Sequence, residues 1–224
     1  IRANRIGSQY NRNSELVVDG YVEIDPEDYT RFTIRWLGLV NRFLRPGGSV
    51  FVISGYSNLH KILRVLRWYR LEEVNHLIWH YNFGVRTTRR FVSSHYHILY
   101  YSKPGGSRFF NPNARFDPTL DELSESKRRE IRSLQYRDMQ DVWVIKREYK
   151  KNVRRTRNAL PEELIRKIIL YASRRNDLIL DPFLGSFITA RVAGKLDRRI
   201  IGFEISEPVY EFGLEELKKS LAKC

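Results

Sequence analysis

Residues 178–187 have the sequence Leu-Ile-Leu-Asp-Pro-Phe-Leu-Gly-Ser-Phe, and residues 199–204 have the sequence Arg-Ile-Ile-Gly-Phe-Glu. The pattern predicts an apolar strand, a tight turn at Gly185, a helix that starts near Phe187, and a second apolar strand that ends in Glu204. Such a turn lets backbone approach a ligand, the helix N-terminus offers free N–H groups, and a carboxylate about 20 residues later can accept both ribose hydroxyls. The stretch therefore indicates half of a Rossmann-like unit that binds a nucleotide-like cofactor.

Strands and helices alternate through most of the chain. Strands that alternate with helices are typical of an α/β layer fold with a mainly parallel central sheet flanked by helices. At 224 residues the chain can bury one sizeable core, so we expect a single domain over residues 1–224. Apolar spacing predicts helices at 27–44, 58–68, 162–173, 187–196 and 207–221, and strands at 49–53, 73–79, 96–102, 177–180 and 199–203.

Residues 104–157 interrupt this alternation. They are polar, heavily charged and short of regular periodicity, which predicts an insertion that serves target recognition. Its part at 146–157 carries seven Lys and Arg residues against one acid, and the whole chain has a formal charge of +14. This charge favours a polyanionic partner, nucleic acid before an anionic membrane, although a run of charges can also be a solvated surface.

Several classes of protein are disfavoured by the composition. No run of about 18 apolar residues occurs and no apolar signal core follows the first residues, so we expect neither a membrane-spanning nor a secreted protein. Cys224 is the only cysteine, which excludes intrachain disulfides and fits a reducing, cytoplasmic compartment. His95 and His97 share one face of a predicted strand, but no third ligand is evident, so we expect no metal.

The turn also has a specific family resemblance. Residues 181–186 (Asp-Pro-Phe-Leu-Gly-Ser), followed by Thr189, resemble the S-adenosylmethionine motif Asp-Pro-Phe-x-Gly-Ser-Gly-x-Thr of amino-methylating DNA methyltransferases. The motif lies C-terminal to the recognition insertion, an order similar to that of the permuted β-class in the N6-adenine/N4-cytosine family. The resemblance implies a Rossmann-like methyltransferase fold with S-adenosylmethionine as cofactor.

The resemblance also implies roles for individual residues. Asp181 and Phe183 would line the methionine and adenine ends of the cofactor, Gly185 and Ser186 would contact it through backbone, and Glu204 would hold the ribose. The alternative is an ordinary strand-turn-helix junction in which Asp181 caps the helix. The residues expected to bind the cofactor are Asp181, Pro182, Phe183, Gly185, Ser186, Phe187, Thr189, Glu204, Leu160 and Pro161.

Phe187 departs from the family pattern, which has a second glycine at this place. Glycine tolerates close approach of a ligand, whereas a phenyl ring there could fill the space of the cofactor's methionine part. Either the ring turns away into the packing of the helix, or the cofactor binds weakly or not at all.

Two further segments resemble family motifs. Pro161 with Asn158 upstream predicts an ordinary helix start, and the family has a similar proline before the cofactor turn, with Lys where this chain has Leu160. Residues 78–99 resemble paired strands around a Trp-x-(Tyr/Lys)-x-x-Gly loop, but His95 is followed by Tyr96 and not by Glu, so no catalytic carboxylate is indicated. The polar and aromatic middle of this segment suits contact with phosphates and an unstacked base. The expected DNA-binding residues are Arg86, Arg89, Arg90, Lys150, Lys151, Arg154, Arg155 and Arg157.

The catalytic motif of the resembling family is absent from this sequence. Its (Asp/Ser/Asn)-Pro-Pro-aromatic tetrapeptide, which grips the target amino group, would precede the helix at residue 27. We expect the sequence to begin just after that loop; residues 8–11 (Ser-Gln-Tyr-Asn) are an alternative, degenerate version that lacks proline. The catalytic residues therefore stay unassigned.

The resemblance implies site-specific methylation of double-stranded DNA, with direct transfer to an exocyclic amine of a flipped base. Adenine N6 is favoured over cytosine N4, and a cognate restriction endonuclease is an expected partner of a monomer or homodimer. Two alternatives remain: a catalytically impaired DNA-binding relative, and an RNA or small-molecule methyltransferase. Binding of the cofactor distinguishes an enzyme from the impaired relative. A preference for duplex DNA over RNA excludes the RNA or small-molecule methyltransferase.

Overall fold

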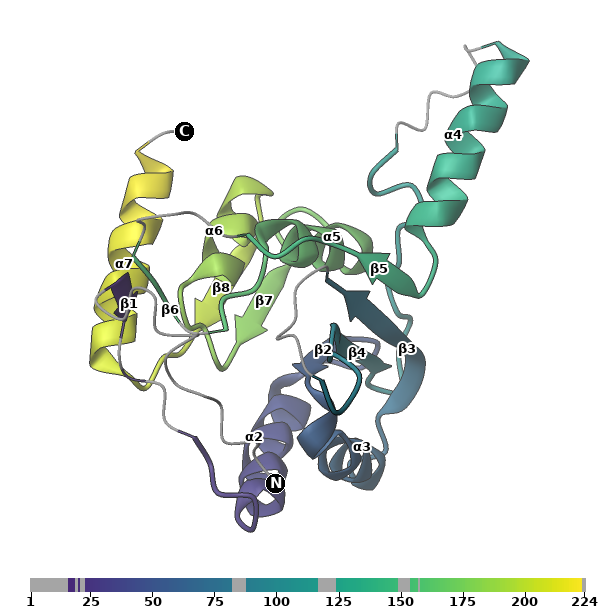
Figure 1. Ribbon diagram of the computed structural model, residues 1–224. Helices are drawn as coiled ribbons and strands as arrows, with labels where there is room; N and C mark the ends of the chain where they lie inside the picture. The colour runs from purple at the N-terminus through teal and green to yellow at the C-terminus, as the bar shows by residue number, and fades with distance from the viewer. Residues whose placement is uncertain are drawn as a thin grey trace.

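The computed structural model describes residues 16–18, 20, 23–81, 88–116, 124–148, 154–156 and 158–222. Each predicted helix and strand is present, so the α/β class is confirmed (Figure 1). The strands are β1 (Val17–Val18), β2 (Ser49–Ser54), β3 (Glu72–His80), β4 (His95–Ser102), β5 (Val142–Val144), β6 (Arg155–Thr156), β7 (Leu178–Asp181) and β8 (Arg199–Gly202). The helices are α2 (Tyr29–Phe43), α3 (Leu59–Trp68), α4 (Glu125–Asp138), α5 (Glu162–Ala172), α6 (Ile188–Lys195) and α7 (Glu207–Leu221), with a 3₁₀ turn at Tyr56–Asn58.

The largest sheet has four strands in the order β2-β4-β3-β5. β3 and β5 are parallel, but β4 runs antiparallel to both β2 and β3, with Val52 opposite Leu99 and Ile78 opposite His97. The prediction of a mainly parallel sheet therefore fails at β4. No helix lies between β3 and β4 in the described part of that connection, and a strand that returns without a helical crossover pairs antiparallel.

The C-terminal third forms a βαβ unit. β7 and β8 pair in parallel, with Ile179 opposite Ile200 and Asp181 opposite Gly202, and α6 connects them. A second short parallel pair joins β1 to β6 beside α7. The unit places the end of β7 and the end of β8 at the same edge, which is where ligands bind in open α/β sheets.

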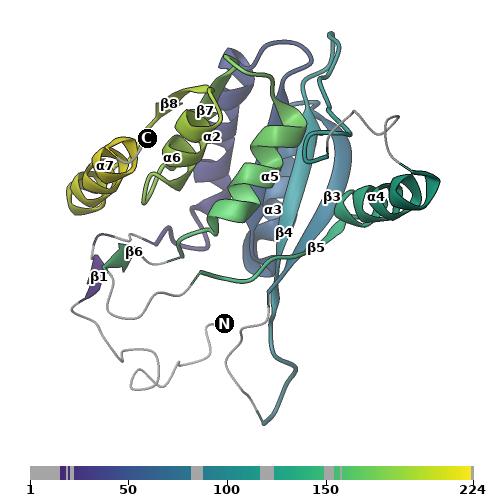
Figure 2. The ribbon, with the colours of Figure 1, turned by 90° about the horizontal axis from the view of Figure 1, so that it is seen from above.

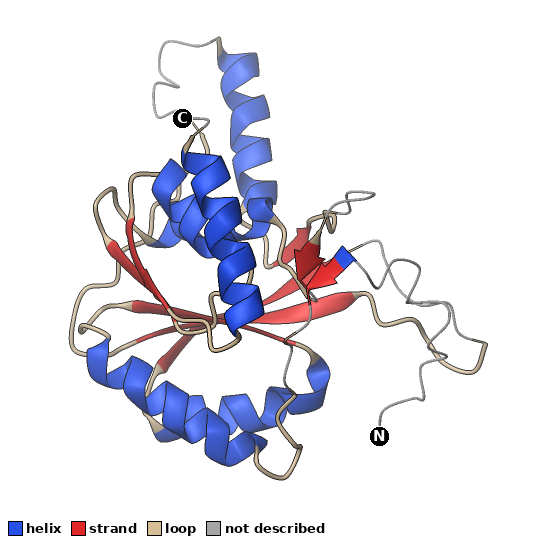
Figure 3. Ribbon diagram, turned by 90° about the vertical axis from the view of Figure 1, so that its left-hand side faces the viewer, coloured by secondary structure: helices blue, strands red, loops and turns tan. Residues whose placement is uncertain are grey.

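The strands lie between layers of helices (Figure 3). α2 and α3 cover one face of the four-stranded sheet, where Leu37 and Leu66 pack with Leu99. α5 contributes Leu164 to the other face, against the fully buried Trp79. In the described part of the chain, no helix is long and apolar enough to cross a membrane.

Residues 104–157, which we predicted to be an insertion, contain a helix that the sequence analysis did not predict. α4 has 14 residues, none of them buried, and it projects from the body of the molecule (Figure 1). A helix that is polar on all sides has no apolar periodicity, which is the pattern on which a helix prediction rests. The lack of periodicity in residues 104–157 therefore gave no indication of α4.

Histidines gather on one face of β3 and β4. His76 Nε2 and His97 Nδ1 are 2.8 Å apart, and the His95 ring meets the His97 ring edge to face. Burial lowers the pKa of His97, and the charges of protonated His76 and His95 lower it further. Within the described residues, no three His, Cys, Asp or Glu side chains are grouped to hold a metal ion.

The lowered pKa of His97 predicts a loss of stability in acid. Below its ordinary pKa of about 6.5, the imidazole takes up a proton in the unfolded chain before it does so in the folded protein. Stability therefore falls as the pH drops below that value, and it is unaffected at pH 8. We expect the His97→Gln variant to lose less stability than the parent between about pH 7 and pH 5 in urea titrations. His60→Gln, an exposed histidine on α3, is the control, and equal acid sensitivity of the parent and the His97 variant would contradict the assignment.

Candidate cofactor site

The turn after β7 has the geometry that the sequence predicts. Gly185 has a φ of +54°, in the left-handed region that glycine occupies at low cost. The Asp181 Oδ1 atom accepts a hydrogen bond from the N–H of Phe183 at 3.0 Å, and the N–H of Leu184 donates to the carbonyl of Phe203 at 2.8 Å. Asp181 thus closes the turn and does not cap α6, whose cap position is Phe187.

Glu204, just after β8, binds the turn that follows β7. Its Oε2 atom accepts the N–H of Gly185 at 2.9 Å, and its Oε1 atom accepts the N–H of Ser206 at 2.8 Å. Two charge-assisted hydrogen bonds fix the orientation of this carboxylate. Each carboxylate oxygen has a second lone pair, so Glu204 can still accept hydrogen bonds from the hydroxyls of a bound ligand.

Phe187 keeps a glycine-like backbone but turns its ring into the protein. Its φ of +58° lies in the left-handed region, and its side chain is only 4% exposed. The ring packs with Leu184 and Ala190 and meets Tyr210 of α7 edge to face, with 5.4 Å between the ring centroids. Of the two orientations that the sequence left open, the structure has the ring rotated away into the helix packing.

Gly213 of α7 provides the space for this ring. A Cβ atom at Gly213 would lie 2.3 Å from the Cδ1 atom of Phe187, closer than any real contact. The ring of Phe187 and the missing side chain of Gly213 are therefore complementary. The sequence indicates neither the direction of the ring nor its partner, because the two residues are far apart in the chain.

Phe183 lies on the surface of the turn and is 52% exposed. Its ring contacts two aromatic residues of α2, with centroid distances of 5.9 Å to Phe32 and 5.3 Å to Trp36. Phe32 also lines an open hollow of about 440 Å³ together with Glu23, Ile24, Asp25, Asp28, Arg31 and Arg35. The turn at residues 182–187, which we call the cofactor turn, thus meets α2 through aromatic rings, and the ring of Phe183 remains partly accessible.

The remaining residues expected at the cofactor lie around this turn. Pro182, Ser186 and Thr189 are partly exposed in the turn and in the first turn of α6. Pro161 is fully buried at the cap position of α5, one residue before its predicted helical place. Leu160 packs against both the sheet core and the α5–α6 core. Leu160 therefore joins the four-stranded sheet to the βαβ unit.

The expected DNA-binding residues are distributed over separate elements. Arg89 and Arg90 are exposed before β4, whereas the guanidinium of Arg154 lies 5.7 Å from the ring centroid of Phe212 on α7. Arg155 is in β6, which lies beside α7, at the opposite side of the molecule from α4 (Figure 2). Arg86, Lys150, Lys151 and Arg157 lie outside the described residues, as do residues 8–11.

One arginine of the basic run lies in an aromatic cluster that the sequence analysis missed. The Arg147 guanidinium is 5.6 Å from the ring centroid of Trp79, 4.8 Å from that of Tyr81 and 5.4 Å from that of Tyr96. The rings lie at the carboxyl end of β3, and the indole N–H of Trp79 donates to Ile145 at 2.8 Å. The alternation of Trp79 and Tyr81 in the sequence was a signal for two rings on one side of the strand.

Comparison with known proteins identifies relatives over nearly the whole chain. Residues 10–215 match the family model N6_N4_Mtase, described as DNA methylase. The chain is 31% identical over 199 residues to type II methyltransferase M.HinfI of Haemophilus influenzae, covering 86% of this chain and 52% of that protein. It is 27% identical over 194 residues to M.HpaI of Haemophilus parainfluenzae, covering 84% and 59%. The chain thus spans little more than half the length of these two curated relatives.

Solved structures share the fold. The M1.HpyAVI–SAM complex superimposes with a TM-score of 0.66 at 20% identity, covering 95% of this chain and 93% of that one. The cytosine-N4-specific PvuII DNA methyltransferase gives a TM-score of 0.65 at 15% identity, covering 92% and 79%. The predicted Rossmann-like methyltransferase fold is confirmed by these likenesses.

The buried ring of Phe187 predicts a stability effect. In Phe187→Gly, the loss of the ring costs about 3–5 kcal/mol, while relief of the left-handed backbone returns about 1 kcal/mol. We expect the free energy of unfolding in urea to fall by about 2–4 kcal/mol. Phe183→Ala removes an exposed ring from the same turn and is the control, with a smaller expected loss. A Phe187→Gly variant as stable as the parent would mean that the ring is not packed against α7.

Proposed function

Because the chain belongs to the DNA methylase family N6_N4_Mtase, we propose that it transfers a methyl group from S-adenosylmethionine to an exocyclic amino group in double-stranded DNA. The observation that carries the proposal is the turn between β7 and α6, where Gly185 is left-handed and Glu204 binds its N–H. The same turn is the part of the sequence that resembles the family's cofactor motif.

The residues of the turn fit S-adenosylmethionine. The first turn of α6 has backbone N–H groups without an intrahelical acceptor, and these suit the carboxylate of the methionine part. Glu204, already held by two backbone N–H groups, would accept the ribose hydroxyls with its remaining lone pairs, and the exposed ring of Phe183 would offer a flat surface to the adenine. Phe187 would contribute its backbone alone, because its ring is enclosed by α6 and α7.

Direct methyl transfer requires the protein to orient the target amine and the methyl group, and it involves no covalent intermediate. When bound, the cofactor supplies a methyl group on a positively charged sulfur, which an amine lone pair can attack directly. The protein must extrude the target base and hold its amino group in line with that methyl. The rings at the carboxyl end of β3 suit a base out of the stack.

DNA is the proposed substrate because of the family and the charge. A formal charge of +14 favours phosphate contact, which supplies much of the affinity of proteins for nucleic acid. We put adenine N6 first as the target and keep cytosine N4 as the second candidate, since the PvuII enzyme with the same fold is cytosine-N4-specific. The orientation of the Phe187 ring removes one of the two reasons to expect a catalytically impaired relative, and the absent catalytic tetrapeptide is the other.

The role of Glu204 predicts an effect on cofactor affinity. The Glu204→Gln variant loses the charge that binds the ribose hydroxyls, so we expect its Kd for S-adenosylmethionine in calorimetry to rise by roughly 10-fold or more. Glu207→Gln, an exposed acid on the first turn of α7, should bind like the parent. If the parent protein binds no S-adenosylmethionine, the proposed function fails; if both variants bind alike, only the role of Glu204 fails.

The product of the reaction can be identified directly. We expect methyl label from S-adenosylmethionine to appear in duplex DNA, and nucleoside digestion to yield N6-methyladenine. N4-methylcytosine in its place would move the target to the second candidate. Label in RNA at matched salt, with none in duplex DNA, would contradict the proposal as a whole.

A further inference from the structure

α4 is exposed on almost every side. Five of its residues are Lys or Arg and three are Asp or Glu, and the only acid in its last turn, Asp138, faces the protein body. Arg132 is exposed, Tyr136 is 71% exposed, and Arg129 is 77% exposed in an ion pair with Glu125. These three cluster on one side of the helix, because residues three and four apart are neighbours. We call this side the outer face of α4.

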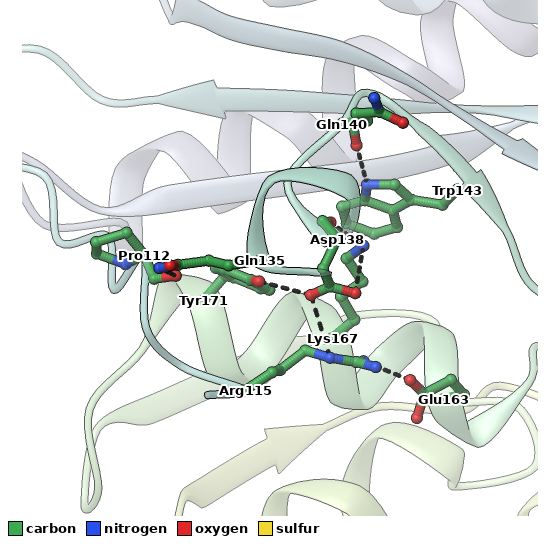
Figure 4. A network of polar contacts seen from close by, with 9 residues as sticks. All are labelled: Pro112, Arg115, Gln135, Asp138, Gln140, Trp143, Glu163, Lys167 and Tyr171. Carbon is green, nitrogen blue, oxygen red and sulfur yellow. Dashed lines mark hydrogen bonds and ion pairs between the residues drawn. The ribbon is translucent and has the colours of Figure 1, made fainter. Parts of the chain in front are cut away.

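The base of α4 is fixed by a polar cluster (Figure 4). Asp138 accepts hydrogen bonds from Lys167 and, at 2.6 Å, from the hydroxyl of Tyr171, both on α5. Arg115 pairs with Asp138 at 3.2 Å and also with Glu163. Lys167 is 5% exposed, and burial lowers its pKa while Asp138 opposes that shift.

The cluster gives a polar helix a fixed direction. A helix without buried side chains has no hydrophobic packing to orient it, so its angle depends on the contacts at its end. Lys167 is buried, so separating Asp138 from it would leave a buried charge uncompensated, and this cost opposes a change in the angle between α4 and α5. Gln135 adds a second contact, because its side-chain amide donates to the carbonyl of Pro112 at 3.0 Å and to Asn113.

We propose that α4 recognises the DNA sequence by entering the major groove with its outer face, and that the Asp138 cluster holds it at the required angle. This inference rests on the proposed function and names the element that selects its substrate. A helix of 14 residues is about 21 Å long and about 10–12 Å wide, and the major groove is about 12 Å wide. Arg132 supplies the guanidinium that pairs with guanine, and Tyr136 supplies a ring and a hydroxyl.

The charge of α4 favours DNA as its partner over a protein. Asp138 is neutralised within its cluster, so the exposed part of the helix carries five cations against two acids. The ion pair of Arg129 with Glu125 is solvent-exposed and worth little, so Arg129 can exchange its partner for a phosphate. A fixed, basic and solvent-exposed helix matches the shape and the charge of the groove.

The test measures discrimination between sequences. A random duplex library is enriched by binding to the parent protein, and the Kd is then measured for the enriched duplex and for a scrambled duplex at one salt concentration. We expect Arg132→Ala to lower the ratio of the two affinities by about 5- to 150-fold, the range for one bidentate base contact, and Tyr136→Ala to lower it as well. Lys127→Ala removes an exposed cation from another side of the same helix and should leave the ratio unchanged.

The role of the cluster is tested with Asp138→Asn. We expect a lower affinity ratio with an unchanged Kd for S-adenosylmethionine, because the helix direction is lost while the cofactor turn stays intact. Gln135→Ala is the second variant for the case that Asp138→Asn does not fold, and its affinity ratio should also fall.

Three results would overturn the inference: no enrichment of any duplex, an unchanged ratio in Arg132→Ala and Tyr136→Ala, or an equal fall in Lys127→Ala. Methyl transfer by the same proteins separates the two proposals. If the parent methylates DNA and the α4 variants keep its sequence preference, only this inference fails. If the parent methylates no DNA, the proposed function fails.

Discussion

One carboxylate determines the shape of the cofactor turn. Glu204, just after β8, accepts the backbone N–H of Gly185 in the turn that follows the neighbouring strand β7, and a second N–H from Ser206. The turn must pass through the left-handed region at Gly185 and again at Phe187, which is costly for phenylalanine. The contact with Glu204 and the enclosed ring of Phe187 offset this cost.

The rest of the fold positions this turn. The βαβ unit brings the ends of β7 and β8 to one edge, and Leu160 packs between this unit and the four-stranded sheet. α5 begins at the same place and receives the Asp138 cluster on its other side. A single helix thus connects the cofactor turn to α4, and four charged residues and a tyrosine meet where α4 joins it (Figure 4).

The elements predicted correctly are those whose pattern lies in neighbouring residues. The features that were missed depend on contacts with distant parts of the chain or leave no apolar pattern. The strands and helices around Gly185 were predicted from apolar spacing and turn chemistry, and the family resemblance added the fold. The direction of β4 was not predicted, because it depends on which strand pairs with it in space. α4 was missed because it buries no side chain, and the Phe187 ring could not be placed without its partner Gly213.

The most direct test of the cofactor site is hydrogen–deuterium exchange of the protein, measured for each peptide with and without S-adenosylhomocysteine. The account predicts slower exchange in peptides that cover residues 183–190 and 202–206, and unchanged exchange in α4, which lies on another side of α5. Slower exchange elsewhere, with these two segments unaffected, would mean that the turn held by Glu204 is structural and that the cofactor binds at another place.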